Sequence, residues 1–190
     1  MNNCSLKSRL TVVFFMKKSL ENFVFFACNE GGHFSQLMAL KDLFGMFPSI
    51  LVTDNERANK SLAALKCIEE IEYAMGDVEM RKKLKDSKKE KITHWDYLPG
   101  YISLFRQCFS IWKKYRPKVI VSTGSNIAVP LFIIGRLHGS KCVFIETRAR
   151  VYGKTLTGKI LTYIANKIIV QWPEMVDVYK GRAEYLGTLV

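Results

Sequence analysis

Blocks of apolar residues alternate along this chain with blocks in which apolar and polar positions follow a helical period. The first kind is typical of strands buried on both faces, and it occurs at residues 22–28, 49–53, 67–73, 119–122, 141–146 and 167–171. The second kind predicts helices, at residues 34–44, 56–66, 98–115, 127–138 and 155–165. Repeated alternation of strand and helix predicts an α/β fold, a Rossmann-like parallel sheet with helices on both faces.

The carboxyl ends of the predicted strands are the expected ligand edge of this sheet. In parallel α/β sheets the strands all end at one edge, and ligands bind there. We therefore expect a single site to be built from the loops that begin at Asn29, Asp54, Thr123 and Thr147.

The length of 190 residues fits one domain with a substantial core. We assign residues 22–190 to this domain and residues 1–21 to an N-terminal extension. The extension contains the apolar run Leu10–Met16, which is far shorter than the ~20 residues that cross a bilayer. Two interpretations stay open: a loose segment ahead of a natural start at Met16, or a helix that dips into a membrane surface.

The formal net charge is +12, and much of it lies in the basic run Arg81–Lys91. This run has no apolar period, so we interpret it as a solvated loop. Attraction to anionic lipid headgroups is the functional alternative. Nucleic acid is not an expected partner, because no recognised binding motif accompanies the charge.

The longest predicted helix, Leu98–Tyr115, confines its polar residues to one narrow stripe. Its broad apolar remainder includes Phe105, Phe109 and Trp112. Such a face is typical of a helix that packs against a core. It also suits a lipid interface, and these three aromatic residues are then the expected membrane contacts.

Five cysteines are scattered along the chain, and none forms a C-x-x-C pair. An odd number without metal-ligand spacing indicates reduced thiols in a cytosolic protein and no metal site. Cys28 and Cys142 lie inside apolar strand patterns, so we expect both to be buried.

The first candidate site element is the sequence Gly31-Gly32-His33, which follows the first predicted strand. A strand that breaks into a helix at two glycines leaves backbone N–H groups unpaired, and such groups bind phosphate or another anion. His33 stands in the first turn of that helix, and an imidazole exchanges a proton near neutral pH. We expect Gly31 and Gly32 to bind an anion and His33 to be catalytic.

A second loop, containing Gly124, Ser125 and Asn126, follows the strand at 119–122. It suits an anion or a sugar, although Ser and Asn are also ordinary helix caps. The strand at 141–146 ends in Glu146, and Arg148 and Arg150 follow it.

A carboxylate at Glu146 suits sugar hydroxyls or the orientation of His33, which makes Glu146 a second catalytic candidate. Guanidinium groups at Arg148 and Arg150 suit a phosphate. A salt-bridged rim is the structural alternative for all three residues.

A stand-alone dinucleotide-binding enzyme is an alternative for such a sheet. Asp54 ends the second predicted strand, about where a ribose-binding acid belongs. However, the first loop offers only Gly31-Gly32 in place of G-x-G-x-x-G. This alternative is therefore the least favoured.

Six segments, taken in order, resemble one family. They are Gly31-Gly32-His33 with Gln36-Leu37, and residues 122–126, 145–150, 156–159, 170–173 and 185–187. With these segments the chain resembles the acceptor-side half of two-chain UDP-sugar glycosyltransferases of the GT-B type. That group includes the membrane-anchoring subunit of the dolichol-linked UDP-GlcNAc transferase and the PssD-like enhancer proteins of bacterial exopolysaccharide and capsule synthesis.

The resemblance implies the fold of a GT-B N-terminal half and a role as a subunit of an inverting glycosyltransferase. Such a subunit would bind a lipid-diphosphate-linked sugar acceptor and recruit a separate donor-binding catalytic subunit to the cytoplasmic face of the membrane. That partner would hold most of the UDP-sugar, so no cofactor is expected on this chain. A non-catalytic membrane scaffold for the same partner is the main alternative, and it stays open.

Overall fold

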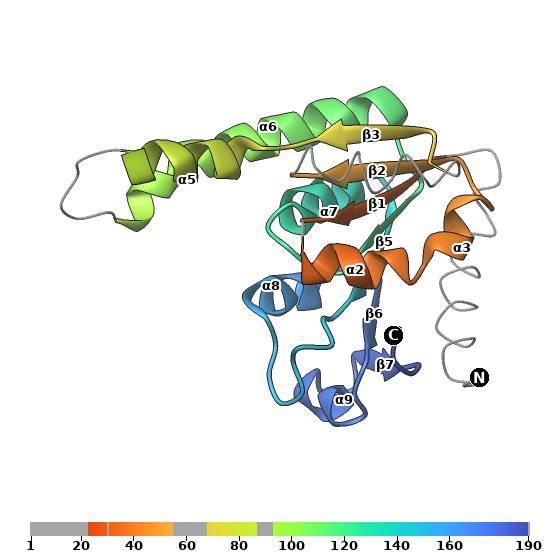
Figure 1. Ribbon diagram of the computed structural model, residues 1–190. Coiled ribbons are helices and arrows are strands. Elements are labelled where there is room, and N and C mark those ends of the chain that lie inside the picture. Colours follow the sequence, from red (N-terminus) through yellow and green to blue (C-terminus); the bar gives the residue numbers. More distant parts are fainter. Residues whose placement is uncertain (1–22, 30, 55–67, 87–92, 190) are drawn as a thin grey trace.

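The computed structural model describes residues 23–29, 31–54, 68–86 and 93–189. Its centre is a seven-stranded sheet in the order β3-β2-β1-β4-β5-β6-β7, in which every neighbouring pair is parallel (Figure 1). The strands are β1 (Val24–Cys28), β2 (Ser49–Thr53), β3 (Glu70–Tyr73), β4 (Val119–Ser122), β5 (Lys141–Ile145), β6 (Lys167–Val170) and β7 (Ala183–Tyr185). The predicted Rossmann-like parallel sheet is confirmed.

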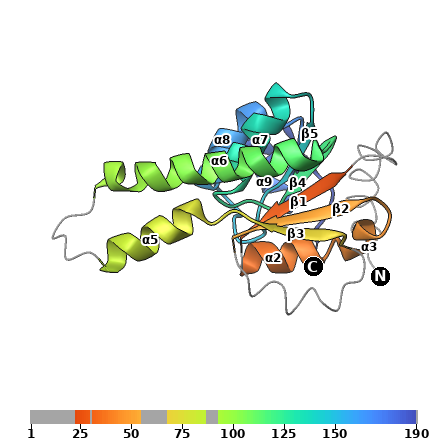
Figure 2. The same ribbon diagram turned by 90° about the horizontal axis from the view of Figure 1, so that it is seen from above.

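Helices cover both faces of the sheet, as predicted (Figures 1 and 2). They are α2 (Gly32–Met38), α3 (Lys41–Phe44), α5 (Gly76–Asp86), the 3-10 helix η1 (His94–Tyr97), α6 (Leu98–Tyr115), α7 (Ala128–Leu137), α8 (Leu156–Ile164) and α9 (Glu174–Val178). On one face Phe44 of α3 packs edge-on against Phe26 of β1, with ring centroids 4.5 Å apart. On the other face Leu104 of α6 and Phe132 of α7 belong to the same buried core cluster as Phe25.

The central strand β1 explains why the core has two halves. Its five residues are fully buried, and their side chains alternate between the two faces.

Of the cysteines in the described ranges, Cys28, Cys108 and Cys142 are buried free thiols, which confirms the expectation for Cys28 and Cys142. Burial raises the pKa of Cys142 to about 12. It also raises the pKa of the Cys28 and Cys108 thiols.

Two predicted segments differ from the structure. The predicted helix 34–44 divides into α2 and α3, because the amides of Ala39 and Leu40 bond to carbonyls three residues back in a tighter turn. The basic run was expected to be a loop, but residues 81–86 form the second half of α5. Packing of α5 on α6 supplies the stability that its apolar pattern does not. The expectations for residues 1–21, 56–66 and 87–91 lie outside the described residues.

Helices α5 and α6 form an arm that extends beyond the sheet, with the start of α5 and the middle of α6 at its root (Figures 1 and 2). Two glycines allow the helices to approach closely. A Cβ on Gly76 would lie under 3.0 Å from the backbone at Leu104, and one on Gly100 would lie under 3.0 Å from Met80. The Gln107 Oε1 atom accepts hydrogen bonds from the backbone N–H groups of residues 75 and 76, at 2.7 and 3.1 Å. The root of the arm is therefore tightly built.

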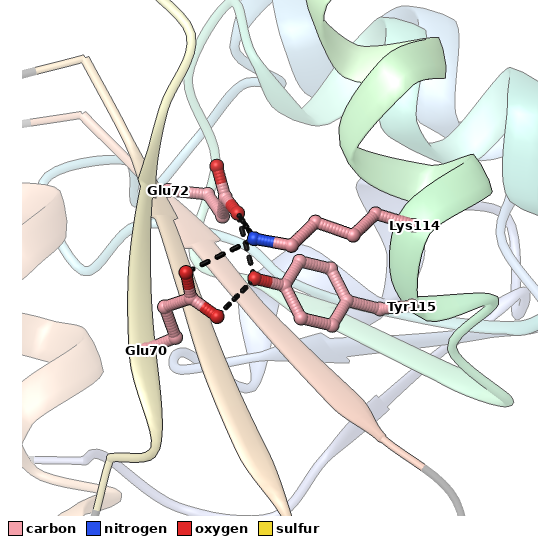
Figure 3. Close-up of polar contacts among 4 residues, drawn as sticks. All are labelled: Glu70, Glu72, Lys114 and Tyr115. Carbon is pink, nitrogen blue, oxygen red and sulfur yellow. Dashed lines mark hydrogen bonds and ion pairs between the residues drawn. The ribbon is translucent and has the colours of Figure 1, made fainter.

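The C-terminal end of α6 is fastened to the edge strand β3 by four polar side chains (Figure 3). The Lys114 ammonium lies 3.0 Å from Glu70 Oε1 and 2.7 Å from Glu72 Oε1. The Tyr115 hydroxyl, with its single proton, lies within hydrogen-bond distance of both carboxylates. The hydrogen bond from Tyr115, and then that from Lys114, hold the pKa of Glu70 below its usual value. Charges on an edge strand also oppose pairing with another chain.

Candidate functional site

The order of the sheet reverses between the adjacent strands β1 and β4. The chain crosses from β1 to β2 on one side of this point and from β4 to β5 on the other side. Ligands of open α/β sheets bind at the carboxyl ends of the strands at such a point. The loops that we expected to share this edge do meet there. The Asn29 amide donates to Asp54, His33 bonds to Thr123, and Gln36 bonds to Thr147.

His33 lies directly across this reversal point. Its Nδ1 atom is 2.8 Å from the carbonyl oxygen of Thr123, and the Thr123 hydroxyl donates to the His33 carbonyl at 2.8 Å. A carbonyl oxygen only accepts, so Nδ1 carries a proton and the neutral ring keeps its lone pair on Nε2. The ring rests on Gly124, where a Cβ would lie 2.9 Å from Cε1. Gly124 also has a φ of +110°, which favours glycine.

Helix α2 begins at two glycines. Gly31 has φ 93° and ψ −139°, and no side chain of the described residues caps the helix. A Cβ added to Gly31 or Gly32 would meet nothing within 4 Å. Among the described residues the first N–H groups of α2 thus lack a side-chain cap, as the anion-binding expectation requires. That role stays a prediction.

Ser125 has two features that ordinary caps do not share. Its φ of +105° is outside the region that a serine normally adopts. Its side chain is only 9% exposed, and within the described part of the chain its hydroxyl has no hydrogen-bond partner. Strained backbone and unpaired buried polar atoms are both rare, and strained positions cluster at functional sites. The binding role of Ser125 stays a prediction. No feature of the sequence reveals the strain, although the neighbouring Gly124 suggests a turn.

A network of hydrogen bonds around two buried glutamine side chains joins the loops after β5 and β6. The Gln36 Nε2 atom donates to the Thr147 hydroxyl at 3.0 Å, and its Oε1 accepts from the Arg148 N–H at 2.9 Å. Gln171 donates to the same Gln36 oxygen at 2.6 Å and accepts from the Leu189 N–H at 3.0 Å. Sequence analysis gave these glutamines no role beyond the resemblance. Their spacing of 135 residues leaves no local signal.

The structure shows structural contacts of Glu146 beside the catalytic role expected for it. The residue is 1% exposed, and donors of the protein surround its carboxylate. The Thr147 N–H, the Thr155 hydroxyl and the Tyr179 hydroxyl donate at 3.0, 3.0 and 2.5 Å. Burial, and then the Glu146 charge, raise the pKa of Tyr179. A Cβ on Gly158 would lie under 3.0 Å from both Glu146 and Tyr179. Glu146 therefore anchors the 147–155 loop, and its catalytic role stays a prediction.

The remaining predicted binding residues lie at the rim. Arg148 and Arg150 are exposed on the loop that Glu146 anchors, and their phosphate role stays a prediction. The Asn126 amide donates at 2.9 Å to Asp77, in the first turn of α5. Asp77 is a site neighbour that sequence analysis missed. In the described ranges, no group of three His, Cys, Asp or Glu side chains is arranged to hold a metal ion.

The expected membrane contacts are only partly at the surface. Phe105 and Phe109 are 39% and 43% exposed, whereas Trp112 is 9% exposed. The Trp112 indole donates to Ser140 at 3.3 Å and lies 4.2 Å from the His138 ring. Trp112 therefore packs mainly at the end of α7, and its contact with a membrane stays a prediction. Within the part of the chain that the structure describes, no helix is both long and apolar enough to span a bilayer.

Solved structures share this architecture. MurG from Acinetobacter baumannii aligns with a TM-score of 0.60 and 14% identity over 80% of this chain and 42% of its own. UDP-N-acetylglucosamine 2-epimerase from Rickettsia bellii aligns with a TM-score of 0.61 and 10% identity over 88% of this chain and 45% of its own. The fold and its ligand edge thus define a Rossmann-like domain of the GT-B N-terminal type.

Residues 30–189 match the family described as "Oligosaccharide biosynthesis protein Alg14 like", and the chain belongs to this family. A UDP-N-acetylglucosamine transferase subunit of Candida albicans is 31% identical over 62% of this chain and 64% of its own length. The corresponding subunit of Schizosaccharomyces pombe is 35% identical over 49% of this chain and 44% of its own. The chain thus spans less than two thirds of these curated relatives.

Proposed function

We propose that this chain is the acceptor-side subunit of a UDP-GlcNAc transferase in lipid-linked oligosaccharide synthesis. Relatives of the family are named as subunits of such a transferase, and the fold is that of one half of a GT-B enzyme. The observation that carries the proposal is the strained, unpaired Ser125 beside His33 at the reversal point of the sheet. Exopolysaccharide or capsule synthesis, the other setting of the resemblance, has no support from the family match.

The donor-binding catalytic subunit is the proposed partner. A single Rossmann-like domain presents one wall of a crevice, and a GT-B enzyme closes that crevice with a second domain. The partner then holds most of the UDP-sugar. This chain supplies the opposite wall, built from the loops after β1, β4 and β5.

Within this wall, His33 is the proposed general base of an inverting transfer. Its Nε2 lone pair accepts the proton of the acceptor hydroxyl, the hydroxyl oxygen bonds to the anomeric carbon, and the bond from that carbon to UDP breaks. The acceptor diphosphate is placed by Gly31, Gly32, Gly124 and Ser125, with Asn126, Arg148 and Arg150 at the rim. The Nδ1–H bond to Thr123 holds the tautomer that this step requires.

Reconstitution of the two-chain complex tests this function. The wild-type pair is expected to transfer GlcNAc from UDP-GlcNAc to a lipid-diphosphate-linked sugar, while each chain alone is inactive. We expect His33→Ala to lower kcat by ~10²–10⁴, the usual value of a positioned base. Lys41→Ala, an exposed residue of the following helix α3, is the control. Full turnover by His33→Ala would refute the base and leave the non-catalytic scaffold.

Membrane attachment is proposed to use the apolar stripe of α6, which consists of five exposed side chains, Leu98, Tyr101, Ile102, Phe105 and Phe109. At its C-terminal end a hollow of about 460 Å³ is lined by Phe109, Trp112, Lys113, Arg116, Lys118 and His138. Among the described residues, no carboxylate forms an ion pair with the cations Lys113, Arg116 and Lys118. An apolar stripe that ends in unpaired cations suits the cytoplasmic face, with its anionic lipids.

Flotation with phosphatidylcholine vesicles, with and without phosphatidylserine, tests this attachment. Wild-type protein is expected to float with the anionic vesicles, and Ile102→Glu/Phe105→Glu is expected to remain in the bottom fraction. Ser110→Glu adds a negative charge to α6 outside the stripe and is the control. Equal flotation of the stripe variant and the control would exclude this surface.

A further inference from the structure

One hydrogen bond connects the arm to the proposed acceptor site. The Asn126 Nδ2 atom donates at 2.9 Å to Asp77 Oδ2, and Asp77 is 4% exposed. The same oxygen lies 3.3 Å from the Arg81 guanidinium, one turn further along α5. A buried carboxylate is stable only when partners of this kind surround it. Removal of either partner therefore disturbs more than a surface contact.

The loop of residues 123–127 needs support from outside, because a serine at φ +105° does not hold itself there. Contacts from several elements supply that support. Thr123 and His33 of α2 make two hydrogen bonds with each other, each at 2.8 Å. Ser122 Oγ accepts from the Gly124 N–H at 3.1 Å, and Thr157 donates to the Ser125 carbonyl at 3.4 Å. The bond between Asn126 and Asp77, at 2.9 Å, ties the loop to α5.

Asp77 is itself fixed by the packing at the root of the arm. Gln107 bonds to the two backbone N–H groups just before it. The close approach at Gly76 prevents α5 from sliding along α6. The Asp77 carboxylate is thus a rigid point to which the loop is attached.

We propose that Asp77 is a positioning residue for acceptor binding, acting through Asn126 to hold the strained Ser125 in place. The inference rests on the proposed function of the same site. It assigns the arm a second role besides any contact with lipid: the seating of α5 on α6 sets the geometry of the acceptor loop. Asp77 does not touch the substrate.

Steady-state kinetics of the reconstituted pair test the inference. Asp77→Ala is expected to raise KM for the lipid-linked acceptor about tenfold, the effect of losing one hydrogen bond to a charged group. KM for UDP-GlcNAc is expected to stay within about twofold, because the partner binds the donor. Glu79→Gln, on an exposed position of the same helix, is the control. Equal effects on both KM values, or none, would overturn the inference.

A polarity exchange separates positioning from general damage to the fold. Asn126→Asp alone places two carboxylates together and is expected to impair acceptor binding. Asp77→Asn/Asn126→Asp restores a hydrogen bond with donor and acceptor exchanged. It is therefore expected to bind the acceptor more tightly than Asn126→Asp, while the carboxylate at 126 keeps its affinity for the diphosphate below that of the wild type. Failure of the double variant to improve on Asn126→Asp would count against the link.

Hydrogen exchange on the isolated chain makes the outcome independent of enzymatic activity. Asp77→Ala is expected to speed amide exchange at residues 123–127 while β6 stays protected. Unchanged exchange in that loop would refute the positioning role. Faster exchange together with an inactive wild-type pair would instead reject the proposed function and retain the link between arm and loop.

Discussion

Replacement of Gly158 by alanine tests whether Glu146 is the structural anchor that the geometry indicates. The new Cβ would lie under 3.0 Å from the Glu146 carboxylate and from the Tyr179 hydroxyl. Neither group can withdraw, because Tyr179 and Glu146 are both buried and hydrogen-bonded to each other. One of them must move, and the hydrogen bond between them must weaken.

The magnitude follows from three effects. Overpacking a core site costs about 1–3 kcal/mol, and weakening a hydrogen bond to a charged group costs up to about 1.5–3 kcal/mol. Alanine is the better helix former and offsets about 1 kcal/mol of this, so we expect a net loss of about 3 kcal/mol in unfolding free energy. For a domain of this size, that loss lowers Tm by about 6–12 °C.

Urea unfolding followed by circular dichroism measures the loss, and Gly153→Ala is the matched control. Gly153 lies in the loop that precedes α8, and a Cβ there meets nothing within 4 Å. We expect the control to unfold at nearly the wild-type midpoint. If Gly158→Ala and Gly153→Ala share one midpoint, the anchor role of Glu146 is wrong.

Three further predictions concern the strained loop, the buried thiols and the clamp on β3. Ser125→Gly is expected to raise the unfolding free energy by about 1 kcal/mol, because glycine adopts positive φ without strain, while acceptor affinity falls; a loss of stability would contradict the strain. Alkylation by iodoacetamide at pH 8, followed by mass spectrometry, is expected to leave Cys142 unmodified in the native protein, because burial raises its pKa to about 12, and labelling before unfolding would contradict this burial. The pKa of the Glu70 carboxyl is lower in the folded protein than in the unfolded chain. Its contribution to the unfolding free energy is therefore fully present above the unfolded-state pKa, and it is lost as the pH falls through the folded-state pKa. Glu70→Gln is therefore expected to make the acid-side loss of stability shallower than in the wild type, and parallel curves would contradict the clamp.

The candidate site was predictable where its chemistry depends on the strand ends. A parallel sheet brings the carboxyl ends of its strands to one edge, so the sequence pattern alone predicts that His33 and Gly124 are neighbours. Their contact confirms this. The roles of Glu146 and Trp112 were not predictable in this way. Both depend on which side chains from distant elements surround them, and no periodicity encodes that.

The sequence by itself determined the order of strands β1 to β6 and of helices α6, α7 and α8, because burial on one or both faces leaves a local period in apolar residues. It also determined the α/β class and the residue types at the ligand edge. Only the tertiary structure decided that residues 81–86 continue a helix, that Ser125 is strained, and that Asp77 reaches Asn126 across 49 residues. These features arise from packing between elements far apart in the chain, where close approach and desolvation override local preference.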